Sequence, residues 1–91
     1  MTKEKLKEVE KVVSKLLAVK TTNISENKIT LYFLDDKAVT LDFDQDYLRD
    51  IKENDIPIII DSFKVISLIE DNNYEIINIS EKGAFPYLGN I

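Results

Sequence analysis

The segment 41–53, LDFDQDYLRDIKE, carries five acidic side chains: Asp42, Asp44, Asp46, Asp50 and Glu53. Counted from the first, they occupy positions 1, 3, 5, 9 and 12, where a calcium-binding EF-hand loop carries its oxygen ligands. That loop also needs glycine at position 6 for a sharp turn, and position 6 here is Tyr47. The acidic spacing therefore matches a calcium loop but its backbone requirement does not, and we predict no metal site.

The same acids are explained by a strand that ends at Phe43 and a helix that begins at Gln45. Asp42 falls on the outward face of the alternating strand, and Asp44 occupies the N-cap position of the helix. Of the remaining three acids, Asp46 falls in the first turn, which the helix dipole favours, and Asp50 and Glu53 fall on the outer helical face. We predict an acidic corner and assign Asp42, Asp46 and Asp50 to an interaction surface.

The residue types that are missing limit the possible chemistry. The sequence contains no histidine and no cysteine, so it lacks the usual general base, the usual zinc ligands and a thiolate nucleophile. Catalysis would have to rest on carboxylates, lysines, hydroxyls or a hard cation held by oxygen. We therefore favour a protein with no catalytic residues and no cofactor.

The charge of −5 is unevenly distributed. Residues 1–20 hold six lysines against three glutamates, a net +3, whereas residues 21–91 hold fourteen acids against six bases, a net −8. An acidic body repels nucleic acid, whose binding depends on neutralising phosphates. No apolar run approaches the length of a membrane span. We expect a cytoplasmic protein that binds a protein partner, or forms a homodimer, and binds neither nucleic acid nor membrane.

The elements that position these side chains follow from the hydrophobic periodicity. Apolar residues at helical spacing predict an amphipathic helix from Thr2 to about Lys20, and the polar segment 21–27 predicts a loop. The β-branched and aromatic runs 28–34 and 38–43, separated by a short polar turn, predict a β-hairpin.

The second half of the sequence predicts a helix over 45–54, a buried strand at 56–60 (IPIII), a helix over 62–72 and a strand at 74–79. These last three elements would form a right-handed βαβ unit with parallel strands. Residues 1–91 therefore predict one α+β domain with a small four-stranded mixed sheet and an N-terminal amphipathic helix. For residues 83–91 the sequence predicts an irregular, apolar C-terminal segment, which we call the tail.

The predicted order resembles the core of the PD-(D/E)xK nuclease fold, which runs helix, three strands, helix, strand. This resemblance implies an alternative, a Mg²⁺-dependent or degenerate phosphodiesterase that uses Asp42, Asp44 and Asp61. The D-x-K sequence motif of these nucleases occurs at residues 35–37, within the predicted hairpin turn. Asp61 and Lys64 are one residue too far apart to form the motif. The motif is thus not placed where that chemistry needs it.

Two further surfaces bear on function. Lys3, Lys7 and Lys11 line one stripe of the first helix, which would suit nucleic-acid binding as a third hypothesis. The tail contributes four apolar interaction residues, which either cover the core edge or contact a partner: Phe85, Tyr87, Leu88 and Ile91. We favour a small acidic protein that acts as an interaction or regulatory module without catalysis.

Overall fold

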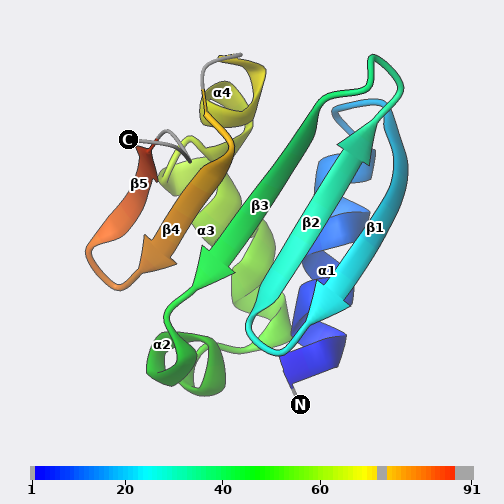
Figure 1. Cartoon of the computed structure of the whole chain (residues 1–91). Coiled ribbons are helices and arrows are strands. Elements are labelled where there is room, and N and C mark those ends of the chain that lie inside the picture. Colours follow the sequence, from blue (N-terminus) through cyan, green and yellow to red (C-terminus); the bar gives the residue numbers. More distant parts are fainter. Residues whose placement is uncertain (1, 72–73, 88–91) are drawn as a thin grey trace.

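The computed structural model describes residues 2–71 and 74–87. It is an α+β fold in which helices lie against one face of a five-stranded mixed sheet (Figure 1). The predicted class is confirmed, but the prediction of four strands is wrong. The sheet has the order β1-β2-β3-β4-β5, in which sequence neighbours are also spatial neighbours.

The first helix, α1 (Thr2–Ser14), packs its apolar stripe onto the core. Leu6, Val9 and Val13 are fully buried. The helix ends before the predicted Lys20, because the chain from Val19 onward forms a strand instead.

That strand, β1 (Val19–Ser25), was missed by the sequence prediction, which gave the end of a helix and a loop. It pairs antiparallel with β2 (Lys28–Phe33) through a two-residue turn in which Glu26 has a φ of 55°. Thr, Ile and Val suit a pleated strand, but β1 shows only partly buried and exposed residues. The pairing with β2, a tertiary contact, therefore decides its conformation.

The predicted hairpin is confirmed. Strand β3 (Ala38–Phe43) pairs antiparallel with β2, and Asp36 in the connecting turn has a φ of 68°. Buried and less buried positions alternate along both strands. The buried positions face the helices, and the alternating ones form the opposite face of the sheet.

The chain then enters α2 (Gln45–Asp50), a short 3₁₀ turn η1 (Glu53–Asp55) and α3 (Ile56–Ser62). The predicted strand at 56–60 is wrong, because IPIII forms most of α3. Pro57 lies in the first turn, where its missing N–H costs nothing. Ile56, Ile59 and Ile60 are buried while Ile58 is 65% exposed, which is helical periodicity.

A break at Lys64, with a φ of 57°, separates α3 from α4 (Val65–Glu70), which is shorter than the predicted helix. Strand β4 (Ile76–Ser80) then pairs parallel with β3. The predicted βαβ unit of segments 56–60, 62–72 and 74–79 is wrong, because 56–60 is helical and the parallel pair is β3 with β4. All the helices after β3 belong to this one crossover.

The last strand, β5 (Gly83–Tyr87), corrects the prediction of an irregular tail. It pairs antiparallel with β4 through a two-residue turn, and Gly83 adopts a φ of 125° that favours glycine. Pro86 is tolerated because β5 is an edge strand. The predicted tail residues Leu88 and Ile91 lie outside the described residues.

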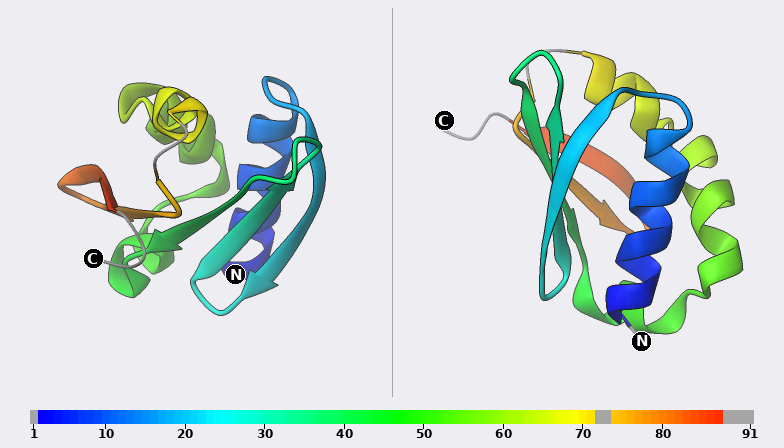
Figure 2. Two further views of the ribbon diagram at one scale, coloured as in Figure 1. Left: turned by 45° about the horizontal axis from the view of Figure 1, so that its top comes forward. Right: turned by 90° about the vertical axis from the view of Figure 1, so that its right-hand side faces the viewer.

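One continuous core fills the space between the sheet and the helices. It contains the buried residues of β2, β3 and β4 together with those of α1, α2, α3 and α4. Figure 2 shows the consequence in its right-hand view: α1, α3 and α4 lie on one side of the sheet. No described element covers the other side, which we call the open face.

The core packing predicts the effect of one central deletion. Replacing the fully buried Leu41 with alanine should lower the free energy of unfolding by about 2–5 kcal/mol. Leu34 is 68% exposed, so Leu34→Ala should change the free energy of unfolding by no more than about 0.5 kcal/mol. Urea unfolding measures both, and equal losses would contradict the placement of the core.

Candidate functional site

The acidic segment 41–53 folds as a strand, a cap and a helix. β3 ends at Phe43, and the Tyr47 N–H donates to Asp44 Oδ2 at 3.0 Å, which confirms Asp44 as the N-cap of α2. Tyr47 packs partly buried against the core, and this burial, with the charges of Asp55 and Glu81, raises its pKa. The residue at the glycine position of a calcium loop is thus a packed helical tyrosine.

A polar hollow of about 600 Å³ opens where β3 and β4 end side by side. Parallel strands carry their carboxyl ends to the same edge, and the backbone N–H of Asp44 donates to the Ile79 carbonyl at 2.8 Å there. We call this hollow, together with its rim, the acceptor hollow. Its lining consists of Glu26, Asn27, Lys28, Asp42, Phe43, Asp44, Gln45, Asp46, Asn78, Ile79 and Ser80.

Asn27 holds the wall of the acceptor hollow in place. Its Nδ2 donates to Asp42 Oδ1 at 3.1 Å and to the Phe43 carbonyl, while the Asn27 carbonyl accepts from the Phe43 N–H at 3.0 Å. The sequence predicts a loop at Asn27 and gives no signal for this role. Its neighbour Glu26 with positive φ marks a tight hairpin turn, but glutamate gives no sequence signal for one.

Asn78 is a second residue that the sequence did not single out. In the parallel register it lies opposite Asp42, and across β5 it lies opposite Phe85. Its Oδ1 atom is buried and has no hydrogen-bond partner among the described residues. A buried carbonyl oxygen of this kind normally accepts a hydrogen bond. The lining of the acceptor hollow therefore includes a residue whose carbonyl oxygen is buried without a partner, opposite the Asp42 carboxylate.

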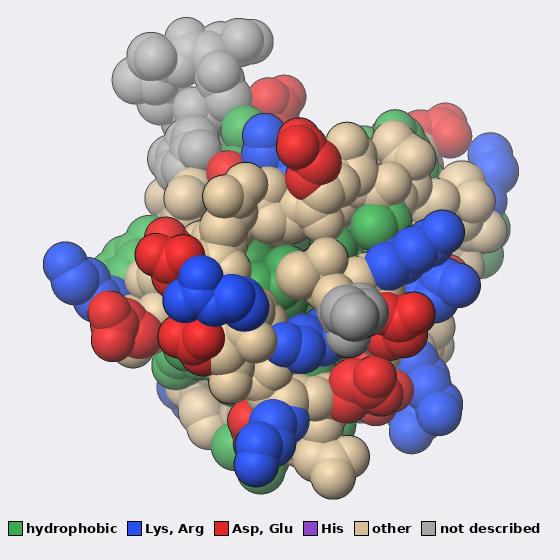
Figure 3. Space-filling model, turned by 90° about the horizontal axis from the view of Figure 1, so that it is seen from below, with side chains coloured by type: hydrophobic (Ala, Val, Ile, Leu, Met, Phe, Trp, Pro, Cys, Tyr) green, Lys and Arg blue, Asp and Glu red, His purple; other side chains and the backbone are tan. Residues whose placement is uncertain are grey.

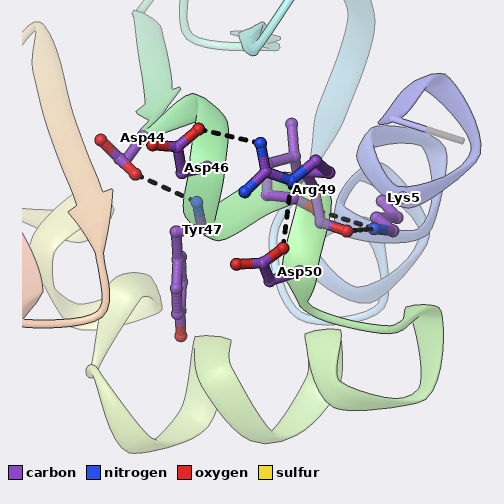
Figure 4. Close-up of polar contacts among 7 residues, drawn as sticks. Lys5, Asp44, Asp46, Tyr47, Arg49 and Asp50 are labelled. Carbon is purple, nitrogen blue, oxygen red and sulfur yellow. Dashed lines mark hydrogen bonds and ion pairs between the residues drawn. The ribbon is translucent and has the colours of Figure 1, made fainter.

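Arg49 neutralises the outer side of the acidic corner (Figure 4). Its Nη1 lies 3.1 Å from Asp46 Oδ1 and its Nε lies 3.1 Å from Asp50 Oδ1. The hydrogen bond and charge of Asp50, with the charge of Asp46, raise the pKa of Arg49. Seen from below, acidic and basic side chains alternate over this end of the molecule (Figure 3). The corner is thus less uniformly acidic than its sequence indicates.

Lys5 ties the N-terminal helix to this corner. Its Nζ donates to the carbonyls of Leu48 and Arg49, each at 2.7 Å (Figure 4). These carbonyls belong to the last turn of α2, where a positive charge is favourable. One lysine of the basic helix is therefore engaged in structure, whereas Lys3, Lys7 and Lys11 are exposed.

The predicted interaction residues separate into distinct groups. Asp42 and Asp46 line the acceptor hollow, while Asp50 is absent from its lining. Phe85 is 54% exposed and shares the open face with Asp42 and Asn78. Tyr87 lies in the register of β5 opposite Ile76. Asp42 of the acidic corner and Phe85 of the predicted tail therefore lie on the same face of the sheet, on the two sides of Asn78 in β4.

The residues of the nuclease alternative are not gathered in one hollow. Asp42 and Asp44 line the acceptor hollow, whereas Asp61 lines a groove between α1 and α3 together with Lys64. Asp35, the first residue of the D-x-K motif, lies in the β2–β3 turn, where its Oδ1 accepts a hydrogen bond from the Lys37 N–H at 3.1 Å. Within residues 2–71 and 74–87, no group of three or more acidic side chains is arranged to hold a metal ion.

Comparisons with known proteins identify no relative. No family model, no curated protein and no solved structure matches this chain. Among the described helices, none is both long and apolar enough to cross a membrane.

The cap predicts a structural effect of Asp44 that can be separated from any binding role. Asp44→Ala should lower the free energy of unfolding by about 1 kcal/mol, because the Tyr47 N–H loses its acceptor. Asp44→Asn removes the same charge but keeps a capping oxygen, so it should retain most of the stability. Urea unfolding of both variants tests this, and equal losses would show that charge, not capping, is responsible.

Proposed function

We propose that this chain is a small cytoplasmic interaction module without catalysis, and that it recognises a basic segment of a partner protein. The observation that carries the proposal is the acceptor hollow, which combines several carboxylates with the unpartnered Asn78 Oδ1 at the end of an open sheet face. The following contacts, charges and exposures support it.

The first support is the supply of hydrogen-bond acceptors. Asp42 and Asp46 each use Oδ1 in the contacts described above, and Asp44 uses Oδ2. An ionised carboxylate accepts several hydrogen bonds over its two oxygens, so each acid retains accepting capacity. Guanidinium and ammonium groups offer donors only, and their hydrogen bonds to carboxylates are strong. An arginine or lysine side chain is the natural complement.

The second support is electrostatic. Glu26, Asp42, Asp44 and Asp46 line the acceptor hollow. The lining contains one cation, Lys28, and Arg49 pairs with Asp46 from outside the lining. The hollow belongs to the part of the chain with a net charge of −8. Clefts lined by one sign of charge concentrate ligands of the opposite sign and speed their association. A basic partner segment is therefore drawn to this end of the sheet, and an anionic one is repelled.

The third support is the exposed apolar surface beside the acceptor hollow. Phe85 remains 54% exposed although it belongs to a sheet. Aromatic side chains are enriched in interface cores, where they add contact area at low entropic cost. Phe85 lies one strand from Asn78, so a partner side chain in the acceptor hollow would bring the rest of its segment against Phe85.

Selection from a random peptide display library tests the proposal. We expect the selected peptides to be enriched in arginine or lysine next to apolar residues. Asp42→Asn should weaken a selected peptide about tenfold, since a charge-assisted hydrogen bond is worth roughly 1.5–3 kcal/mol. Fluorescence anisotropy measures this with the labelled peptide.

Asp50→Asn is the matched control, because it removes the same charge but lies outside the lining of the acceptor hollow. It should change the affinity by less than about twofold, as expected for an exposed charge. Equal weakening by the two variants would reveal general charge attraction and contradict a specific site. Selected peptides without basic residues would contradict the proposed partner chemistry.

A further inference from the structure

The sheet has two edges, and they differ in what they offer to another strand. β1 and β5 are the edge strands. A free edge presents unpaired N–H and C=O groups to which another chain can bind, and proteins commonly block it. The direction of these groups in each edge strand follows from the two-residue turns that begin the β1–β2 and β4–β5 ladders.

The β5 edge is largely blocked. Because Ser80 and Gly83 close a two-residue turn, the groups of Gly83 and Phe85 point toward β4, and those of Ala84 and Pro86 point away. Proline has no N–H, so Ala84 supplies the only outward donor between Gly83 and Pro86. A strand added to β5 would lose part of its ladder.

Within β1, no proline interrupts the outward-pointing N–H groups of the edge. Ser25 and Lys28 close the turn, so the groups of Thr22 and Ile24 point away from β2. Both residues have an N–H, and no hydrogen bond joins these outward groups to the rest of the described chain. The right-hand view of Figure 2 looks onto this edge and shows β1 and α1 side by side at its front.

We propose that β1 pairs antiparallel with β1 of a second copy, so that two sheets join into one around a twofold axis. Such an interface must be complementary to itself. Centred on Asn23, the pairing sets Thr22 opposite Ile24 of the second copy, so that the outward groups of both residues are satisfied. The same register directs Lys20, at the irregularity of β1 between Val19 and Thr21, toward Glu26 in the β1–β2 turn of the second copy, twice across the axis. This charge complementarity favours a second copy of this chain as the partner.

The flank of α1 supports the same occupant. Val12 and Leu16 line the groove that α1 shares with α3, so the opposite flank of the helix faces the β1 side. At 100° per residue, Lys3, Lys7 and Glu10 fall together on that flank. A twofold axis at β1 runs the two α1 helices antiparallel, which brings Lys3 and Lys7 of one copy toward Glu10 of the other. Opposite charges thus lie close together both between the two β1 strands and between the two α1 helices of the dimer.

Sedimentation equilibrium and amide hydrogen exchange on the whole chain test the pairing. We expect a monomer–dimer equilibrium, with the Thr22 and Ile24 amides becoming protected as the protein concentration rises. The Ala84 amide is the internal control, because it points outward from the other edge and should stay unprotected. A monomer at every concentration, with Thr22 and Ile24 unprotected, would overturn the proposal.

A charge exchange gives the second test without altering the backbone. Lys20→Glu should weaken the dimer about tenfold by placing like charges together, and the double variant Lys20→Glu/Glu26→Lys should restore it. Thr22→Pro should abolish the dimer by removing one outward donor while sparing the ladder to β2. A dimer that survives Thr22→Pro, or that the double variant fails to restore, would overturn the register. Lys20→Glu and Thr22→Pro leave the lining of the acceptor hollow unchanged, whereas Glu26→Lys alters it, so the hollow is tested separately by Asp42→Asn in a chain that keeps Glu26.

Discussion

The parallel pairing of β3 with β4 is the constraint on which the rest of the structure depends. A parallel connection needs a long crossover, and here the crossover holds α2, η1, α3 and α4. Together with α1, these helices bury the face of the sheet that carries Leu41 and Ile77, and they leave the other face open. The same pairing ends both strands at one edge, where the chain turns into the capped helix α2. The acceptor hollow exists because of that shared edge.

The polar contacts around the acceptor hollow divide into those that build the fold and those left available to a ligand. Asp44 caps α2, Asn27 fixes the wall beside Asp42, and Lys5 binds the carbonyls at the end of α2. The Arg49 pairs are exposed and contribute little to stability. Asn78 Oδ1 has no such structural assignment in the described chain. The proposed binding role rests in part on this acceptor without a structural partner.

Much of the fold was predictable where local sequence and tertiary contacts agree. The β2–β3 hairpin and the Asp44 cap follow from alternation and helix-start signals. The segment IPIII was misread because a short apolar run has no periodicity, and only the exposure of Ile58 shows a helix. β1 was missed because its polar sequence becomes a strand only through pairing with β2. Asn27 and Asn78 were missed because their roles depend on neighbours that are distant in sequence.

The proposed function requires that the acceptor hollow binds a cationic side chain. The most direct measurement is a titration of the ¹⁵N-labelled protein with an arginine-containing peptide, followed by NMR. We expect the side-chain amide signals of Asn27 and Asn78 and the backbone signals of Asp42 and Asp44 to shift together and to saturate. Shifts confined to the outer face of α2 around Asp50, or no saturable shift in the acceptor hollow, would contradict it.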